Sequence, residues 1–430
     1  MRINNFIVSF KEKIKDCIID DSKIHLPKNA IMRFVSLLDD VDDARLQGMI
    51  EYPLKEIILI AFLSTLSGAD SWPTIASYGK KKIKWLKKFL PFKNGTPAHD
   101  TFRRVFSLID PSQLEKATTL FVTDFFEKVK KIFKIEFKGK DQICVDGKVE
   151  CGSGRKYHTS EEVKQFSLLH VYDASNEICL YSKFVDVKTN EIPVAQEVME
   201  TLYLNGKIVT FDALHTQVET IRIIRKRMGD YVGAVKTNQE TLFGCCVQAF
   251  TSDKLDRIRK TSNYIKSETD KQHRQIETRE YFKVDAKNLE IDEKWIDVRS
   301  VICYIKKMYD YVTKETKKEM RIYITSLTDL ETISEAIRNH WSVENKLHWH
   351  LDVTFGEDAN KTMDKAAFTN LSLMNKMCLS LLKLIQPRYN IGLKSIKKLF
   401  GWETDGMIRE LLSYYSRSEI KNALTLKDKK

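Results

Sequence analysis

Two strand-like segments of this sequence are each interrupted by a single aspartate, and this feature limits the possible folds more than any other. Asp146 lies in the apolar run ICVDGKV, and Asp212 lies in IVTFDAL. A carboxylate within a buried strand is costly unless it is paired, hydrogen-bonded or bound to a metal. For either residue alone, a strand-end turn or a helix cap is a sufficient explanation. Together they favour a polar site at one sheet edge, because open α/β sheets usually bind ligands where parallel strands end.

A third acid, Glu344, lies in the helical pattern IRNHWSVENKLHWHLDVTF. At helical spacing Leu347 and Leu351 are expected near Glu344, so we expect its carboxylate to point along a buried side. Three converging carboxylates need a cation, and hard oxygen ligands without cysteine favour Mg²⁺ or Mn²⁺. Two such ions about 4 Å apart can activate water and stabilise the leaving oxygen of a phosphodiester. The three acids therefore predict metal-dependent nuclease chemistry.

The same segment offers a second kind of metal site. His340, Glu344 and His348 are spaced by four residues along one expected helix face, which is a possible zinc site. The order H-x-x-x-E-x-x-x-H differs from the H-E-x-x-H of helical zinc sites, so we rank this alternative lower. The histidines are otherwise expected to be hydrogen-bonded core residues or DNA contacts.

The pattern of the chain changes near residue 138. Before it, from residue 53 to about 129, apolar residues recur at three- and four-residue spacing, which predicts a compact all-helical domain. After it we expect three successive strands and then helix, strand, helix, strand, helix, which predicts a mixed sheet with helices packed on it. Residues 251–327 are strand-rich again and predict a β insertion, in which the charged segment TKETKKEM separates two strands.

These patterns predict an α/β protein of more than one domain. With 430 residues, 43% of them hydrophobic, the chain is long enough for two or three domains with substantial cores. Two long helical patterns follow the β insertion, at 333–351 and 370–384. We expect a helical domain at 25–130, a sheet domain at 138–390 with its β insertion at about 251–327, and a C-terminal helical tail at 391–430.

The composition of the chain indicates what kind of partner it binds and in which cellular compartment it is expected. Lys and Arg outnumber Asp and Glu by 71 to 59, and the formal net charge of +12 favours a polyanionic partner such as nucleic acid. On charge alone, a merely basic soluble protein is an equal alternative. The eight cysteines form no C-x-x-C pair, so neither a disulfide framework nor a zinc ribbon is indicated. Without a secretory signal or an apolar run of about 20 residues, we expect a cytoplasmic protein with no membrane segment.

Basic residues near the expected strand ends are candidate phosphate contacts. Lys148 belongs to VDGK, and Lys188 and Lys236 begin the similar segments KTNE and KTNQ, each of which precedes a helix. The asparagines of these segments are candidate helix caps, while the lysines are candidates to hold phosphates near the strand ends. Arg338 and His340, in the late helix, complete the set of candidate DNA contacts.

Several motifs between about residues 40 and 385 occur in the order found in one protein family. They are GTPAHDTFRRVFSLIDP, VDGK, LLHVYDASN, KTNEIP, VTFDALHTQ, DYVGAVKTNQ and RNHWSVENKLHWHLDVTFGED. On these motifs the chain resembles the bacterial insertion-sequence transposases of the ISAs type, which include the H-repeat-associated proteins of Rhs elements. The resemblance implies a ribonuclease H-like catalytic core with a β insertion between the second Asp and the Glu. It also implies a preceding helical domain particular to the family.

Carried over position by position, the resemblance implies a catalytic triad of Asp146 in VDGK, Asp212 in TFDALH and Glu344 in WSVEN. It implies two Mg²⁺ or Mn²⁺ ions, cleavage of double-stranded DNA at terminal inverted repeats, and strand transfer into target DNA. It further implies a homodimer on DNA, associated with the bacterial nucleoid. Cys151 and Gln275 depart from the family pattern, so an inactive or domesticated relative that binds DNA without cutting is the alternative. A nuclease without strand transfer is a third hypothesis.

Overall fold

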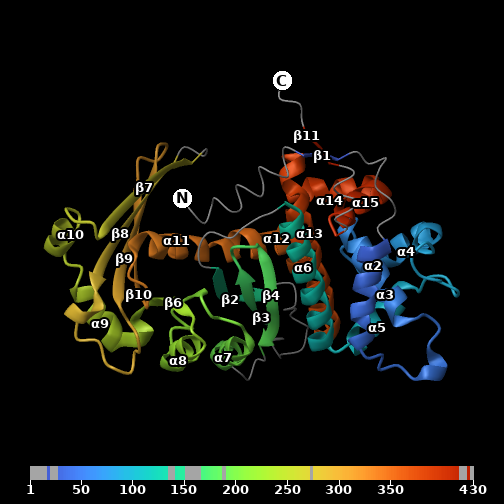
Figure 1. The fold of residues 1–430 in the computed structure, drawn as a ribbon, viewed down its shortest axis with the longest axis horizontal. Coiled ribbons are helices and arrows are strands. Elements are labelled where there is room, and N and C mark those ends of the chain that lie inside the picture. The colour runs from blue at the N-terminus through green and yellow to red at the C-terminus, as the bar shows by residue number, and fades with distance from the viewer. Residues whose placement is uncertain are drawn as a thin grey trace.

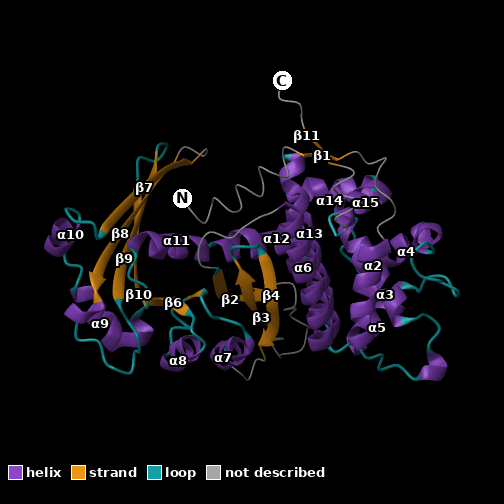
Figure 2. Ribbon diagram, in the orientation of Figure 1, coloured by secondary structure: helices purple, strands orange, loops and turns teal. Residues whose placement is uncertain are grey.

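One large sheet, helices on both of its faces and a helical bundle beside it make up the described part of the chain (Figure 1; Figure 2). The computed structural model describes residues 17–19, 28–133, 141–150, 166–185, 190–271, 275–415 and 424–426. The predicted α/β class is confirmed, whereas Lys188 and Cys151 lie outside the described residues. Of the helices in these ranges, none combines the length and apolar character needed to cross a lipid bilayer.

The sheet has nine strands in the order β4-β3-β2-β5-β6-β10-β9-β8-β7. Pairing of β5 with β2 and with β6 is parallel, and the other neighbours pair antiparallel, so the predicted mixed sheet is confirmed. The strands are β2 (Gln142–Glu150), β3 (Phe166–Asp173), β4 (Ile178–Val185), β5 (Ile208–Phe211), β6 (Asp230–Val235), β7 (Tyr264–Lys271), β8 (Gln275–Asp285), β9 (Ser300–Asp310) and β10 (Thr316–Thr325).

Strand β5 is buried on both faces because helices cover both sides of the sheet. On one side, Ile208 shares a core with Ile333 of α11 (Leu330–His340). On the other, Val209 shares a core with Val194 of α7 (Glu191–Thr201) and Ile221 of α8 (Val218–Lys226). As predicted, Asn190 caps α7, where its side chain accepts a hydrogen bond from the Ile192 backbone N–H at 3.3 Å. The helices α9 (Glu240–Gln248) and α10 (Ser252–Ile258) follow β6 in the chain.

The strand-rich segment predicted as a β insertion extends the same sheet. Its strands β7 to β10 join the sheet through β10, which pairs with β6 in the register Ile322↔Val235. Only the first three residues of the charged segment TKETKKEM lie in the turn that separates β9 from β10, and the rest belong to β10. Strand β10 begins at Thr316, within that segment, because the chain pairs with β9 along its whole length and leaves the charged side chains exposed.

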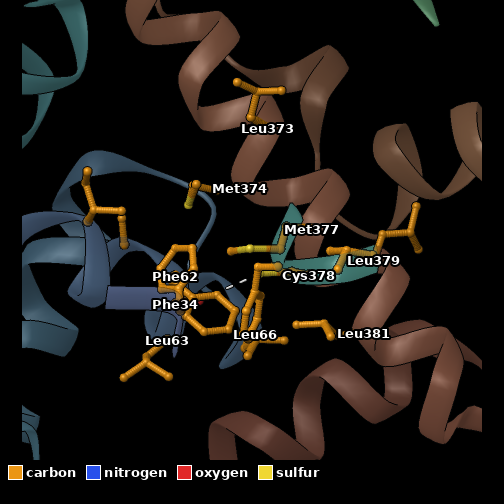
Figure 3. Packing of buried hydrophobic residues seen from close by; sticks show 14 of the residues in the cluster. Phe34, Phe62, Leu63, Leu66, Leu373, Met374, Met377, Cys378, Leu379 and Leu381 are labelled. Atoms are coloured by element: carbon orange, nitrogen blue, oxygen red, sulfur yellow. Dashed lines mark hydrogen bonds between the residues drawn. The ribbon is translucent and has the colours of Figure 1, made fainter. Parts of the chain in front are cut away.

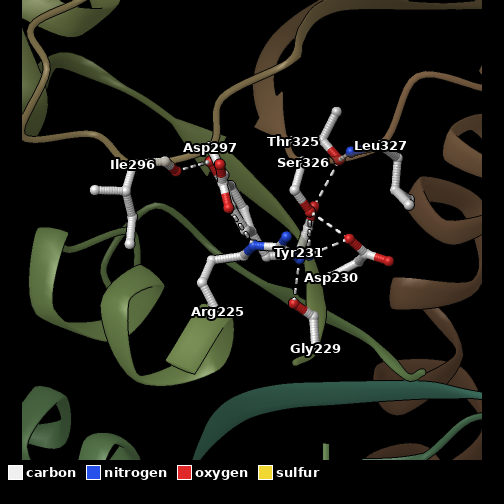
Figure 4. Close-up of polar contacts among 9 residues, drawn as sticks. All are labelled: Arg225, Gly229, Asp230, Tyr231, Ile296, Asp297, Thr325, Ser326 and Leu327. Carbon is white, nitrogen blue, oxygen red and sulfur yellow. Dashed lines mark hydrogen bonds and ion pairs between the residues drawn. The ribbon is translucent and has the colours of Figure 1, made fainter. Parts of the chain in front are cut away.

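A polar cluster ties the first residues of β6 to the last residues of β10 (Figure 4). Arg225 Nη1 and Ser326 Oγ both donate to Asp230 Oδ1, at 2.8 and 2.9 Å. Thr325 Oγ1 donates to the backbone oxygen of Tyr231 at 2.6 Å. Because α11 begins shortly after β10, this cluster also fixes where the helix that leads to Glu344 leaves the sheet.

The helical bundle contains helices from both ends of the described chain and lies next to β4, which α6 and α13 contact. In the bundle, α13 packs on α3, α5 and α6, while α14 contacts α3 and α15 contacts α2. The short strands β1 (Cys17–Ile19) and β11 (Leu424–Leu426) pair antiparallel. The bundle helices are α2 (Lys28–Leu37), α3 (Leu54–Leu66), α4 (Trp72–Leu86), α5 (His99–Leu108), α6 (Pro111–Phe133), α13 (Lys365–Tyr389), α14 (Leu393–Trp402) and α15 (Thr404–Ser413).

The core of the bundle joins α13 to the helices of the first part of the chain (Figure 3). Phe34 of α2 and Phe62 of α3 are fully buried, and their rings lie 4.9 Å apart. From α13, Met377 enters the same core, and Cys378 Sγ contacts the backbone oxygen of Phe62 at 3.7 Å. The segments predicted to be helical are therefore helical, and they share one core with a late helix. The domain limits 25–130, 138–390 and 391–430 stay predictions.

Candidate active site

The two aspartates predicted from their strands lie on neighbouring strands, at the point where the parallel pairing of β2 with β5 ends. Strand β2 runs parallel to β5 in the register Val145↔Phe211, so the next residues, Asp146 and Asp212, follow paired positions. This is the parallel arrangement expected from the sequence. Asp146 is partly buried, with a side chain that is 20% exposed.

The turn that carries Asp212 is held by hydrogen bonds. Asp212 Oδ1 accepts from the backbone N–H groups of Leu214 and His215, at 3.0 and 3.1 Å. Asn238 Nδ2 donates to the backbone oxygen of Ala213 at 2.7 Å. The prediction that Asn238 caps a helix is wrong, because α9 begins at Glu240 and the Asn238 side chain binds this turn instead.

Glu344 lies in a π-helical segment, Val343–His348, that follows α11 and leads into α12 (Trp349–Val353). Within it, the Trp349 N–H donates to the oxygen of Glu344, five residues earlier. A π-turn holds more residues than an α-turn, so side chains point in directions that α-helical spacing does not predict. Glu344 is consequently exposed, whereas Leu347 and Leu351 are buried. The prediction of a buried direction for its carboxylate is wrong.

The three carboxylates interact electrostatically. Burial raises the pKa of Asp146 to about 7, and the negative charges of Asp212 and Glu344 contribute to the increase. Loss of hydration also raises the pKa of Glu344, while the Arg321 guanidinium opposes that change. Crowded carboxylates of this kind favour a cation or a proton between them. Asp212 and Glu344 thus both lie close enough to Asp146 for their charges to act on its carboxyl group.

The fit of these acids to divalent ions depends on how many ions are bound. In the described part of the chain, no three or more His, Cys, Asp and Glu side chains are close enough to hold one ion together. In a site for two ions, each ion needs only some of the carboxylates, and one acid can serve both. The charges of Asp212 and Glu344 both act on Asp146, so the three acids are compatible with a site in which each ion is held by fewer than three of them. Their oxygen donors suit Mg²⁺ or Mn²⁺.

Comparison with known proteins places this arrangement in a family. The Transposase DDE domain family matches residues 137–381, which is more than half of the chain, and the DDE_Tnp_1-associated family matches residues 35–122. This chain belongs to the bacterial DDE insertion-sequence transposase family. Asp146, Asp212 and Glu344 all lie within the matched transposase domain.

Two proteins of Escherichia coli strain K12 are similar in sequence to most of this transposase-family chain. The putative protein YbfL is 32% identical over 76% of this chain and 83% of its own length. The H repeat-associated putative transposase YhhI is 31% identical over the same shares of the two chains. Among solved structures, a piggyBac transposase synaptic complex with hairpin DNA aligns at a TM-score of 0.34 and 12% identity, over 97% of this chain and 81% of that one. That likeness is too low to establish a shared fold.

The histidines near Glu344 point to different partners, so the row proposed for zinc is not assembled among the described residues. His340 Nδ1 lies 3.0 Å from Thr210 Oγ1 of β5, and burial lowers the pKa of His340 to about 4. His348 Nε2 lies 2.9 Å from His170 Nδ1 of β3, and its other ring nitrogen lies 3.8 Å from Asp146 Oδ2. These contacts favour the expectation of hydrogen-bonded internal residues over a DNA contact for His340.

The candidate phosphate contacts differ in accessibility. Lys148 is only 7% exposed, and its Nζ lies 2.7 Å from Asp352 Oδ1, so in this structure it binds a carboxylate of the same chain. Lys236 and Arg338 are exposed and stay candidates for DNA contact. Sequence reasoning missed Glu191, the last residue of the KTNE segment. Its charge also raises the pKa of Asp146. No feature of the local sequence indicates that this acid lies near Asp146.

Proposed function

We propose that this protein is a DNA transposase that cuts the ends of its insertion sequence and joins them to target DNA. Asp146, Asp212 and Glu344 are the proposed catalytic and metal-binding residues. The observation that carries the proposal is that Asp146 and Asp212 follow paired positions of two parallel strands, with the charges of Asp212 and Glu344 both acting on Asp146, inside the domain that matches the DDE family. DDE transposases normally use divalent metal and act on DNA.

We also propose that the sheet is a ribonuclease H-like core. In support, three antiparallel strands, β4-β3-β2, are followed in space by β5 and β6, which run parallel to β2. Asp146 and Asp212 directly follow the last residue pair, Val145 and Phe211, of the parallel β2/β5 pairing, and ligands commonly bind where parallel strands end. A homodimer on DNA, which would allow two element ends to be processed together, belongs to the same proposal.

In this proposal the reacting phosphate lies between the three acids and exposed basic side chains. Divalent ions, when bound, supply Lewis acidity and lower the pKa of a bound water molecule. Asp146, Asp212 and Glu344 would hold these ions, and the charges of the other two acids act on Asp146. Lys236, which directly follows β6, and Arg338 of α11 are both exposed, and we propose that they neutralise DNA backbone charge.

The proposal is tested with labelled element ends and Mg²⁺. Asp146→Asn should keep the fold and DNA binding but reduce end cleavage on the order of 1,000-fold, the loss expected when several kcal/mol of metal-assisted stabilisation disappear. Asp253→Asn, which changes an exposed acid of α10, is the matched control and should cleave normally. Undiminished cleavage by Asp146→Asn, with the protein folded, would refute the catalytic role.

An inactive DNA-binding relative is the second candidate function. One similar protein carries the name inactive transposase YbfQ, and it is 32% identical over 18% of this chain and 88% of its own length. Under this alternative, the unaltered protein binds element ends and nicks none of them at any concentration of Mg²⁺ or Mn²⁺. Metal-dependent nicking that stops without strand joining would instead indicate the nuclease hypothesis.

A further inference from the structure

A glycine directly follows Asp146, and the space that a side chain would occupy there is filled by the carboxylate of Glu191. A Cβ atom built on Gly147 would overlap with Glu191 Oε2 and lie 2.8 Å from Glu191 Cδ. Any larger residue at position 147 would therefore have to displace this carboxylate. Glu191 itself is the first residue of α7, so the helix presents its acid to the strand beside Asp146.

Two further contacts hold the Glu191 carboxylate in that place. Ser167 Oγ of β3 donates to Glu191 Oε1 at 2.9 Å. Glu191 Oε2 lies 3.7 Å from Nε2 of His215, a side chain that is only 1% exposed. The backbone N–H of His215 donates to Asp212 Oδ1 at 3.1 Å. One carboxylate thus contacts the strand of Asp146, the neighbouring strand, and the residue that holds Asp212.

We propose that Glu191 is a positioning residue that holds the Asp212 turn against the strand of Asp146 and thereby sets the affinity of the site for divalent cations. The inference rests on the proposed function, because it assumes that Asp146 and Asp212 bind those cations. Glu191 acts through geometry, by linking Gly147, Ser167 and His215, and through charge, by adding a fourth carboxylate beside the proposed ligands. Partners of metal ligands commonly change metal affinity by 10- to 100-fold when they are removed.

The test measures Mn²⁺ binding to the full-length protein without DNA, by electron paramagnetic resonance of the free ion. Glu191→Ala should weaken Mn²⁺ binding on the order of 10- to 100-fold. Glu191→Gln keeps the size of the side chain and an acceptor for Ser167, so it should weaken binding by a smaller factor. Gly147→Ala leaves Glu191 in the chain but displaces its carboxylate, and should act like Glu191→Ala.

The matched control is Glu197→Gln, which neutralises an exposed acid of the same helix. It should bind Mn²⁺ as the unaltered protein does, and circular dichroism should show that all variants are folded. A second measurement follows end cleavage against Mg²⁺ concentration. In both Glu191 variants the midpoint should rise, while the maximal rate should recover at saturating metal, which general damage to the fold would not produce.

The results separate this inference from the proposed function. If Asp146→Asn binds Mn²⁺ as tightly as the unaltered protein, the proposed metal site itself is refuted. If Asp146→Asn weakens binding but both Glu191 variants bind as tightly as Glu197→Gln does, the role of Glu191 is refuted, whatever Gly147→Ala does. Weakened binding in Asp146→Asn and in both Glu191 variants, with normal binding by the control, supports the inference.

Discussion

The strand-borne acids and the helix-borne acid of the candidate site are held in different ways. Asp146 and Asp212 follow paired positions of two central strands, and two backbone N–H groups bind Asp212 Oδ1. Glu344 is exposed in a π-helical segment, and within the described residues its side chain has no hydrogen-bond partner. We infer that the sheet fixes two acids before a ligand arrives, whereas the third is free to adjust to it.

The strongest test of this difference changes the length of each acid by one methylene. Asp212→Glu should reduce end cleavage about 100-fold or more, because misplacing a reacting group by about 1 Å has effects of that size. Glu344→Asp should lose only about 10-fold, since an exposed side chain without a hydrogen-bond partner among the described residues can adjust to compensate. The measurement is the end-cleavage rate of each variant at saturating Mg²⁺. Equal losses in the two variants would show that all three acids are held with the same rigidity.

A smaller effect is expected in the stability of the metal-free protein. The pKa of Asp146 is raised from 3.8 to about 7, so the folded state binds its proton more tightly than the unfolded state does. The charged carboxylate therefore destabilises the fold fully above pH 7, and this cost disappears as the pH falls toward 4.

Asp146→Asn removes that cost. With EDTA present, it should stabilise the protein at pH 8, on the order of 1 kcal/mol or more, and by only about a quarter as much at pH 4.5. Urea unfolding at the two pH values measures the difference, and Asp253→Asn serves as the control. A stabilisation that is the same at both pH values would mean that the Asp146 carboxyl group is not strained by burial and by its acidic neighbours.

The smallest expected effect tests the support of the Asp212 turn. Asn238→Ala removes the hydrogen bond to the backbone oxygen of Ala213. A single hydrogen bond contributes about 1 kcal/mol, so end cleavage should fall about fivefold. Thr237→Ala changes the exposed neighbouring side chain and should be neutral. Normal cleavage by Asn238→Ala would show that the backbone bonds to Asp212 Oδ1 are sufficient to hold the turn.

Features encoded locally could be predicted from the sequence. The order of strands and helices from β2 to α9 follows from apolar periodicity and turn residues, and the structure confirms it. The parallel pairing of β2 with β5 could be predicted because a helix, α7, separates β5 from the preceding strands. Asp146 and Asp212 could also be identified from the sequence, because each is a single acid in an apolar strand and burying a carboxylate without a partner is costly.

Features that depend on distant partners could not be predicted. Lys148 contacts Asp352, which is far away in the sequence, so its burial has no local signal. The closeness of Glu191 to Gly147 arises only when α7 packs against the sheet. The exposure of Glu344 depends on a π-turn, and apolar spacing in the sequence does not distinguish a π-turn from an α-turn.

A π-turn is equivalent to an α-helix with one residue inserted, and this gives the segment Val343–His348 an evolutionary consequence. Loss of one codon, such as that of the exposed Asn345, would let the helix return to regular winding and would change the direction of Glu344 relative to the residues that follow it. We expect such a deletion variant to fold and to bind DNA but not to cut it. A gel-shift assay measures the binding, and a cleavage assay measures the cutting. A single codon deletion would then produce a copy of the transposase that binds the ends of related, active elements without cutting them.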